Sequence, residues 1–190
     1  SQTFFARNTC LEADSAACGE IVYEIIQHLT ALTADIALPL YVAVSTDCGG
    51  FQYGNTTART HRIAAALMDV VDVAAVNKTL FRTKSRVRLA MESRMVADMK
   101  LFDHQRVVVM EIPLSLRQEM QATDADIEEL SALPALVEGT DCGVTLRELR
   151  PGVIKISLRT GPRVNATKVC ALLGGGGHAA AAGATLSATL

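Results

Sequence analysis

The chain has 190 residues, of which 49% are hydrophobic and 20% are charged, and its formal net charge is −2. This composition supports a folded core in one domain or two small ones and excludes a disordered chain. No apolar run reaches the roughly 20 residues of a membrane helix. The slight acidity argues against broad binding of duplex nucleic acid, which depends on many lysine and arginine contacts. A small anionic substrate held by a few local cations is compatible with this charge.

The five cysteines are irregularly spaced, and no CxxC pair occurs. We therefore predict reduced cysteines rather than a zinc knuckle or a disulfide framework, which favours a cytoplasmic protein. The chain begins with Ser1, and the residues that follow do not form a secretory signal. Such a beginning is expected of a cut through the middle of a longer protein.

In the first half, Glu12–Leu32 has apolar residues at helical spacing. Leu38–Ser45 is a short, continuously apolar run, which is typical of a strand covered on both faces in a parallel sheet. The residues of Thr57–Val70 and Val71–Phe81 again favour helix. A helix, a buried strand, a loop and a helix in that order predict an α/β layer.

The second half begins with Lys84–Met99, a helical segment without glycine or proline that could connect two subdomains. We place the boundary near residue 83. A strand is predicted over Arg106–Ile112, followed by helices and a hairpin. The helices cover Ser115–Gln121, Asp124–Leu133 and, with Asn165 as its cap, Asn165–Leu173; the hairpin pairs Cys142–Leu149 with Val153–Leu158 about Arg150, Pro151 and Gly152.

Asp47 is the first candidate site residue because it follows the predicted buried strand, where ligands bind in open α/β sheets. A carboxylate there suits Mg²⁺ or Mn²⁺. Aspartates after strands are, however, more often turn formers or helix caps. His61 could reach the same cleft, although a histidine in this position more often packs locally.

The second candidate is the run Gly174–Gly177 followed by His178. Glycines let backbone N–H groups approach a ligand, and successive amides can bind an anion. A flexible linker that ends the helix is an equally good interpretation of such a run. Arg159 and Arg163 are the third candidate, because a guanidinium can bind phosphate or stack on a base. Solvated loop arginines are the alternative.

Two groups of motifs together resemble the DHH phosphoesterases. Ser45–Phe51 (STDCGGF), Asn55–Thr57 (NTT) and Thr60–Ala65 (THRIAA) are similar to the fourth motif of that family. Later segments resemble the DHH-associated C-terminal domain and occur in the same order as in that domain. They are Lys155–Arg159 (KISLR), Asn165, Gly174–His178 (GGGGH) and Ala181–Gly183 (AAG).

The resemblance implies the C-terminal part of a parallel-sheet DHH domain over residues 1–83. A linker helix and a smaller α/β DHH-associated domain with a mixed sheet would follow over residues 84–190. In the family a pair of Mn²⁺ ions activates water, and Asp47 matches a metal-binding and catalytic aspartate. The residues that match the substrate-binding segments are Arg159, Gly175, Gly176, Gly177 and His178.

Within the family, the nearest likeness is to bacterial oligoribonucleases that are also phosphatases. The expected partner is short single-stranded RNA or a nucleotide, cleaved to 5′-mononucleotides, or 3′-phosphoadenosine 5′-phosphate, which would lose its 3′-phosphate. No membrane partner is expected. The Asp-His-His triplet and the other aspartates of the family are missing from this sequence. We therefore expect the chain alone to be inactive and not to retain Mn²⁺, and its exposed apolar surface could support a homodimer.

Two alternatives stay open. One is a phosphodiesterase for cyclic dinucleotides, which shares these motifs. The other is a nucleic-acid-binding module without catalysis, of the kind attached to alanyl-tRNA synthetases; Asp47 and the residues after it argue against that reading. A RecJ-like exonuclease fits less well, because the chain has no marked basic surplus.

Overall fold

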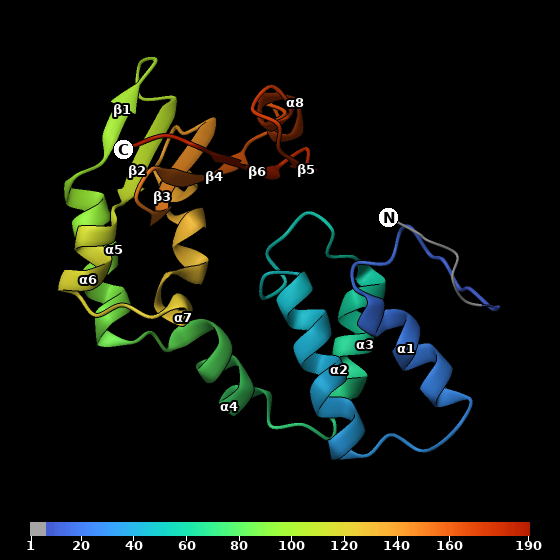
Figure 1. The fold of residues 1–190 in the computed structure, drawn as a ribbon. Coiled ribbons are helices and arrows are strands. Elements are labelled where there is room, and N and C mark those ends of the chain that lie inside the picture. The colour runs from blue at the N-terminus through green and yellow to red at the C-terminus, as the bar shows by residue number, and fades with distance from the viewer. Residues whose placement is uncertain (1–6) are drawn as a thin grey trace. The chain divides into compact units, whose positions relative to one another are not determined.

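The computed structural model describes residues 7–190, which divide into two compact units at Thr83 (Figure 1). The first six residues lie outside the described part. The prediction that the chain does not begin with a secretory signal concerns these residues. Among the described residues, no helix combines the length and apolar character that a membrane crossing requires.

The first unit, described from residue 7, is helical. It contains α1 (Cys18–Gln27), α2 (Ala34–Asp47), α3 (Ala58–Met68), α4 (Val73–Asn77) and a π-helical turn, η1 (Lys78–Arg82). Its core lies between the first three helices, where Tyr23, Leu40, Tyr41, Ile63 and Leu67 are buried. No strand occurs between residues 7 and 83.

The predicted strand Leu38–Ser45 is therefore wrong, and residues 7–83 contribute no strand to the parallel sheet expected of a DHH domain. The segment belongs to α2. Periodicity alone does not separate a short buried strand from a buried helix when the run is continuously apolar. The buried residues of α2 recur at helical spacing, at Ala37, Leu40, Tyr41 and Val44.

The second unit is a six-stranded sheet with helices, and its mixed α/β class was predicted correctly. Its strands follow the order β1-β2-β3-β4-β6-β5. The strands are β1 (Lys100–Phe102), β2 (Val107–Ile112), β3 (Cys142–Arg150), β4 (Val153–Thr160), β5 (Gly176–His178) and β6 (Ala181–Leu186). The helices are α5 (Arg86–Ala97), α6 (Leu114–Glu119), α7 (Asp124–Ile127), the 3₁₀ segment η2 (Glu128–Leu136) and α8 (Ala166–Ala171).

The sheet is mixed because β2 and β3 are parallel while every other neighbouring pair is antiparallel. The predicted strand at Arg106–Ile112 and the predicted hairpin are confirmed as β2 and as β3 with β4. The helix predicted after Asn165 is also confirmed: the Asn165 side chain accepts a hydrogen bond from the backbone N–H of Lys168.

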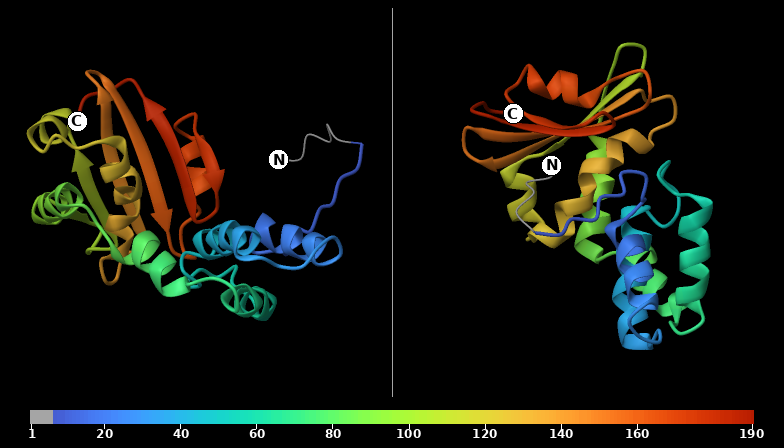
Figure 2. Two further views of the ribbon diagram at one scale, coloured as in Figure 1. Left: turned by 90° about the horizontal axis from the view of Figure 1, so that it is seen from below. Right: turned by 90° about the vertical axis from the view of Figure 1, so that its right-hand side faces the viewer.

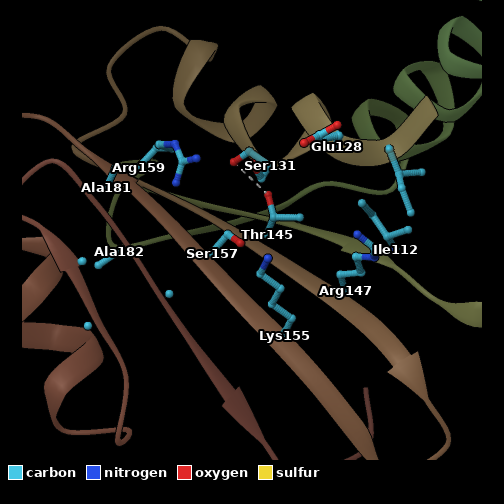
Figure 3. Close-up of a pocket in the computed structure, with 14 residues that line it drawn as sticks. Ile112, Glu128, Ser131, Thr145, Arg147, Lys155, Ser157, Arg159, Ala181 and Ala182 are labelled. Atoms are coloured by element: carbon cyan, nitrogen blue, oxygen red, sulfur yellow. Dashed lines mark hydrogen bonds between the residues drawn. The ribbon is translucent and has the colours of Figure 1, made fainter. Parts of the chain in front are cut away.

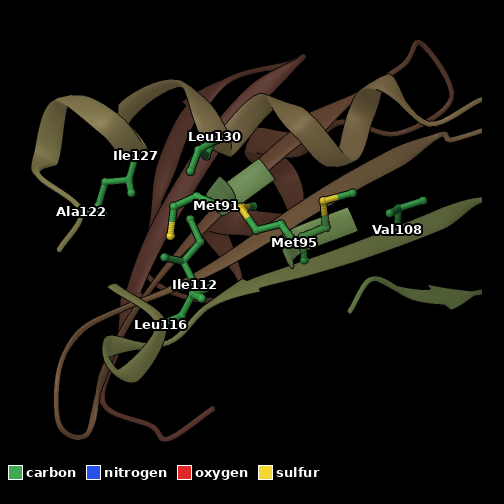
Figure 4. Packing of buried hydrophobic residues seen from close by; sticks show 9 residues of the cluster. Met91, Met95, Val108, Ile112, Leu116, Ala122, Ile127 and Leu130 are labelled. Atoms are coloured by element: carbon green, nitrogen blue, oxygen red, sulfur yellow. The ribbon is translucent and has the colours of Figure 1, made fainter. Parts of the chain in front are cut away.

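Helices cover both faces of this sheet (Figure 2). Alternate residues of β2 point to one face, where Val108, Met110 and Ile112 pack against Met91 and Met95 of α5 and against Leu130 of η2 (Figure 4). On the opposite face, Leu158 packs with Ala166 and Cys170 of α8. The unit is thus a three-layer structure in which η2 lies on the face that α5 covers.

Candidate functional site

The pairing register of the sheet places polar residues in rows beside the apolar side chains of β2. Directly paired residues of neighbouring strands point to the same face. Met110 is followed across the sheet by Thr145, Ser157 and Gly183, and the next row runs from Ile112 through Arg147 and Lys155 to Thr185. The face is therefore apolar under α5 and polar over β3 and β4.

A cavity of about 350 Å³ lies over this polar part of the sheet. Its floor includes Thr145, Ser157, Lys155 and Arg159, as Figure 3 shows. η2 forms the opposite wall with Glu128 and Ser131, and β5 and β6 close one side. We call this cavity the sheet pocket.

η2 approaches the sheet closely because β3 has glycine at the contact. A Cβ at Gly143 would lie 2.5 Å from the backbone nitrogen of Ala135. The Thr145 hydroxyl donates a hydrogen bond of 3.3 Å to the carbonyl oxygen of Ser131, which ties the floor to the wall. These contacts hold η2 over the pocket.

The charges in the sheet pocket are unevenly paired. Arg147 donates to Asp124 at 2.6 Å, and this carboxylate also pairs with Arg117 at 3.0 Å. Arg159 donates to the carbonyl oxygen of Leu158 at 3.1 Å, which leaves its charge uncompensated. Within residues 7–190, neither Arg159 nor Lys155 has a carboxylate within salt-bridge distance. The pocket therefore has a positive floor along β4, an arrangement that suits an anion.

The glycine run divides into two parts with different roles. The N–H groups of Gly174 and Gly175 donate to the carbonyl oxygens of Ala171 and Cys170 and so close the end of α8. These two amides are not free to bind an anion. Gly176 and Gly177 belong to β5 and line the sheet pocket, whereas Gly175 lines a neighbouring hollow that also includes Gly176.

The space available for a side chain differs between Gly175 and Gly176. A Cβ at Gly175 would lie 2.2 Å from the carbonyl oxygen of Gly183, so β6 leaves no room for it. At Gly176 the corresponding space is open for 4 Å. Gly176 is therefore a position where the absence of a side chain enlarges the pocket rather than permits the fold.

The structure brings Arg159 together with Gly176 and Gly177 but leaves the other basic candidates outside. His178 is exposed, and although it pairs with Ala181 it is not among the residues that line the sheet pocket. Arg163 is also exposed and lies 3.5 Å from Asp141. Lys155 and Ser157 lie in the segment KISLR but were assigned no role from the sequence, and Glu128 was not a candidate; the register of β4 brings the first two to the same face as Arg159.

Asp47 is the last residue of α2 and is exposed. Its backbone carbonyl accepts a hydrogen bond of 3.2 Å from the Asn55 side-chain amide, which also donates to Ala16 at 3.0 Å. Asn55 thus connects the end of α2 to the segment before α1. His61 stacks on the Phe51 ring with a centroid distance of 5.3 Å, which supports the local-packing interpretation of this histidine.

The buried carboxylate of Glu20 stabilises the same region, and it was not predicted from the sequence. Glu20 is 1% exposed and accepts hydrogen bonds from the Thr60 hydroxyl at 2.5 Å and from the Ala16 backbone N–H at 3.1 Å. Ala16 is also the residue that Asn55 contacts. A chain of hydrogen bonds therefore runs from α3 through Glu20 and Asn55 to Asp47.

The described residues around Asp47 do not by themselves complete a site for a pair of metal ions. Within residues 7–190, no group of three histidine, cysteine, aspartate or glutamate side chains is placed to hold a metal. Burial raises the pKa of the neighbouring Cys48 thiol, so a ligating thiolate is disfavoured there. Asp47 alone offers too few ligands for the octahedral oxygen coordination typical of Mg²⁺ and Mn²⁺.

A comparison with models of known families finds no match. The chain is 33% identical over 179 residues to the bifunctional oligoribonuclease and PAP phosphatase NrnA of Thermus thermophilus. This match covers 93% of the chain and 53% of the relative, so the chain spans about half the length of the curated relative it matches.

The fold is shared with an exopolyphosphatase-related protein from Bacteroides fragilis. Its crystal structure aligns with a TM-score of 0.90 at 22% identity, over 98% of this chain and 56% of that chain. Because likeness in sequence extends along almost the whole chain and the fold agrees with it, the chain belongs to the DHH family of phosphoesterases.

Proposed function

We propose that the chain holds the substrate of a metal-dependent phosphoesterase that acts on short oligoribonucleotides and on 3′-phosphoadenosine 5′-phosphate. Cleavage would release 5′-mononucleotides or inorganic phosphate. The name of the Thermus thermophilus relative describes both activities. The observation that carries the proposal is the positive floor of the sheet pocket, where Arg159 faces the glycines of β5 without a carboxylate partner.

The residues of the sheet pocket would bind and orient the nucleotide. Arg159 can make a charge-assisted hydrogen bond to a phosphate oxygen. Gly176 leaves room for the phosphate to approach the backbone of β5. On the other wall, the Glu128 carboxylate can accept hydrogen bonds from sugar hydroxyls or base amino groups.

The hydrolytic step needs more than these residues supply. Metal ions, when bound, would activate a water molecule and stabilise charge on the transferring phosphoryl group. Asp47 is the proposed metal ligand of this chain. Further ligands would have to be supplied by residues other than 7–190, because the described part holds no group of three potential metal ligands that includes Asp47. The proposed role of this chain is therefore binding and orientation.

The proposal is tested by equilibrium binding of adenylate dinucleotides to the 190-residue protein. A dinucleotide with a 5′-phosphate should bind more tightly than the same dinucleotide without it, and duplex RNA should compete poorly. Equal affinity for the two dinucleotides would contradict a phosphate site. If this chain alone released AMP in the presence of Mn²⁺, the proposal that Asp47 needs further metal ligands from other residues would be contradicted.

The same titration separates the alternatives. A cyclic diadenylate has no terminal phosphate, so it should compete weakly if Arg159 holds a terminal group. Strong competition by the cyclic compound would favour the cyclic-dinucleotide phosphodiesterase. A module for general nucleic-acid binding would instead gain affinity steadily with the length of a single-stranded RNA.

A further inference from the structure

Two uncompensated cations enter the sheet pocket from the same strand. Lys155 and Arg159 are four residues apart on β4 and point to one face, with Ser157 between them. At the usual rise of a strand, their Cα atoms are about 13 Å apart. The pocket therefore has two centres of positive charge rather than one (Figure 3).

The exposed Lys155 lies beside a second cation on the sheet. Lys155 pairs directly with Arg147 of β3, and like charges opposite each other on a sheet are destabilising. Arg147 shares the Asp124 carboxylate with Arg117, whereas Lys155 forms no salt bridge within residues 7–190. An anion beside Lys155 would remove this repulsion.

Lys155 also lies between two hollows. It lines the sheet pocket and the neighbouring hollow, which share Gly176 and Gly183 as well. The neighbouring hollow adds the exposed Thr185, whose hydroxyl can donate to an anion. A ligand that extends past Ser157 along β4 therefore meets a second group of donors at Lys155.

Glu128 limits where negative charge can lie. Its carboxylate belongs to η2, on the wall opposite β4 (Figure 3). Repulsion from this carboxylate favours phosphate groups along β4 and leaves the space near η2 for the sugar and base. The sheet pocket thus separates a phosphate side from a nucleoside side.

We infer that Lys155 is a specificity-determining residue that binds a second phosphate group. The ligand class is a nucleotide with two separate phosphates, one at Arg159 and one at Lys155, such as 3′-phosphoadenosine 5′-phosphate or a 5′-phosphorylated dinucleotide. This inference rests on the proposed function, because it assumes that Arg159 binds the first phosphate.

The test measures affinities of the 190-residue protein for 3′-phosphoadenosine 5′-phosphate, AMP and adenosine by calorimetry. Lys155→Ala should weaken binding of the bisphosphate by roughly tenfold or more, the fold-change of one lost charge-assisted contact. Binding of AMP should change by less than about threefold, as expected for a screened charge. Lys155→Arg should restore most of the affinity for the bisphosphate.

Lys168→Ala is the matched control, because Lys168 is exposed on α8 and lines neither hollow. It removes the same charge and should leave both affinities unchanged. Circular dichroism should show that Lys155→Ala folds normally, since it relieves a repulsion.

Equal losses for AMP and the bisphosphate in Lys155→Ala, or no loss for either, would overturn the inference while the proposed function stands. Failure of the unmodified protein to prefer AMP over adenosine would overturn both.

Discussion

The two units of the chain carry their candidate residues in different ways. In residues 7–83 the candidates are close in sequence: Asp47 and Asn55 are joined across one loop by a hydrogen bond of 3.2 Å. In residues 84–190 the sheet pocket draws on five strands, on η2 and on the end of α7, so Glu128, Arg159 and Gly176 meet only through the fold. The first set of candidates therefore lies within one short motif, whereas the strand register brings the second set together.

The units also differ in whether their charged side chains have hydrogen-bond or salt-bridge partners. Glu20 is buried in the first unit, and both of its carboxylate oxygens accept hydrogen bonds. In the second unit Lys155 and Arg159 are left without carboxylates. The first arrangement stabilises local structure, and the second keeps binding capacity for an anion.

The largest effect on stability is expected for substitution of Gly175, whose missing side chain allows β6 to approach closely. Gly175→Ala would place a Cβ 2.2 Å from the Gly183 carbonyl oxygen, so we expect a loss near the upper end of roughly 1–3 kcal/mol in the free energy of unfolding. Gly176→Ala should stay within about 0.5 kcal/mol of the unmodified protein and instead weaken nucleotide binding. Urea denaturation followed by circular dichroism measures the free energy of unfolding of both variants. Similar stabilities would contradict the different roles assigned to Gly175 and Gly176.

The next effect concerns the buried carboxylate of the first unit. Glu20→Ala leaves the Thr60 hydroxyl and the Ala16 N–H without their acceptor, so we expect a loss of roughly 1–3 kcal/mol. Glu24→Ala is the control on the same helix, because Glu24 forms a partly exposed salt bridge with Arg59 and should cost at most about 1 kcal/mol. The thermal denaturation midpoints should differ in that order; equal midpoints would show that burial of Glu20 contributes nothing.

A smaller and opposite effect is expected at Asp47. Its negative charge lies at the C-terminal end of α2, where the helix dipole is unfavourable for an anion. Asp47→Asn should therefore raise the free energy of unfolding by about 0.3–1 kcal/mol. Asp35→Asn at the opposite end of α2 should lower it. A loss of stability in Asp47→Asn would mean that its carboxylate has a favourable partner.

The smallest effect is a change in acid stability through Glu12. The hydrogen bond from Arg59 lowers the pKa of the Glu12 carboxyl in the folded protein. This pair therefore stabilises the fold above the unfolded pKa of about 4.3, and the contribution disappears as the pH falls through the lower folded value. Glu12→Gln should reduce stability at neutral pH and flatten its decline below pH 4.3. An unchanged slope in thermal denaturation between about pH 3 and 5 would contradict this.

The sequence predictions were correct where the signal is local and wrong or absent where the structure depends on contacts distant in sequence. The hairpin Cys142–Leu149 with Val153–Leu158 was predictable because its alternation and its turn are local. β5 and β6 were missed, since glycine and alanine have weak strand propensity. They form strands here because β6 pairs with β4 and β5 pairs with β6. α2 was mistaken for a strand, although the burial spacing from Ala37 to Val44 is helical.

The candidate residues show a similar limit. The family motifs indicated Arg159 and Gly176, which the structure places in one pocket. They include Lys155 in the segment KISLR but assign it no role, and they do not include Glu128; the register of β4 and the path of η2 bring these residues to the pocket. The roles of Asp47 and His178 stay predictions.

The central claim is that Arg159 binds a nucleotide phosphate in the sheet pocket, and calorimetric titration with 3′-phosphoadenosine 5′-phosphate tests it most directly. Arg159→Ala should weaken binding by roughly 10- to 150-fold, as expected for one charge-assisted contact of about 1.5–3 kcal/mol. Arg163→Ala removes the same charge four positions later, outside the pocket, and should leave the affinity nearly unchanged. Equal affinities for the two variants would contradict the account.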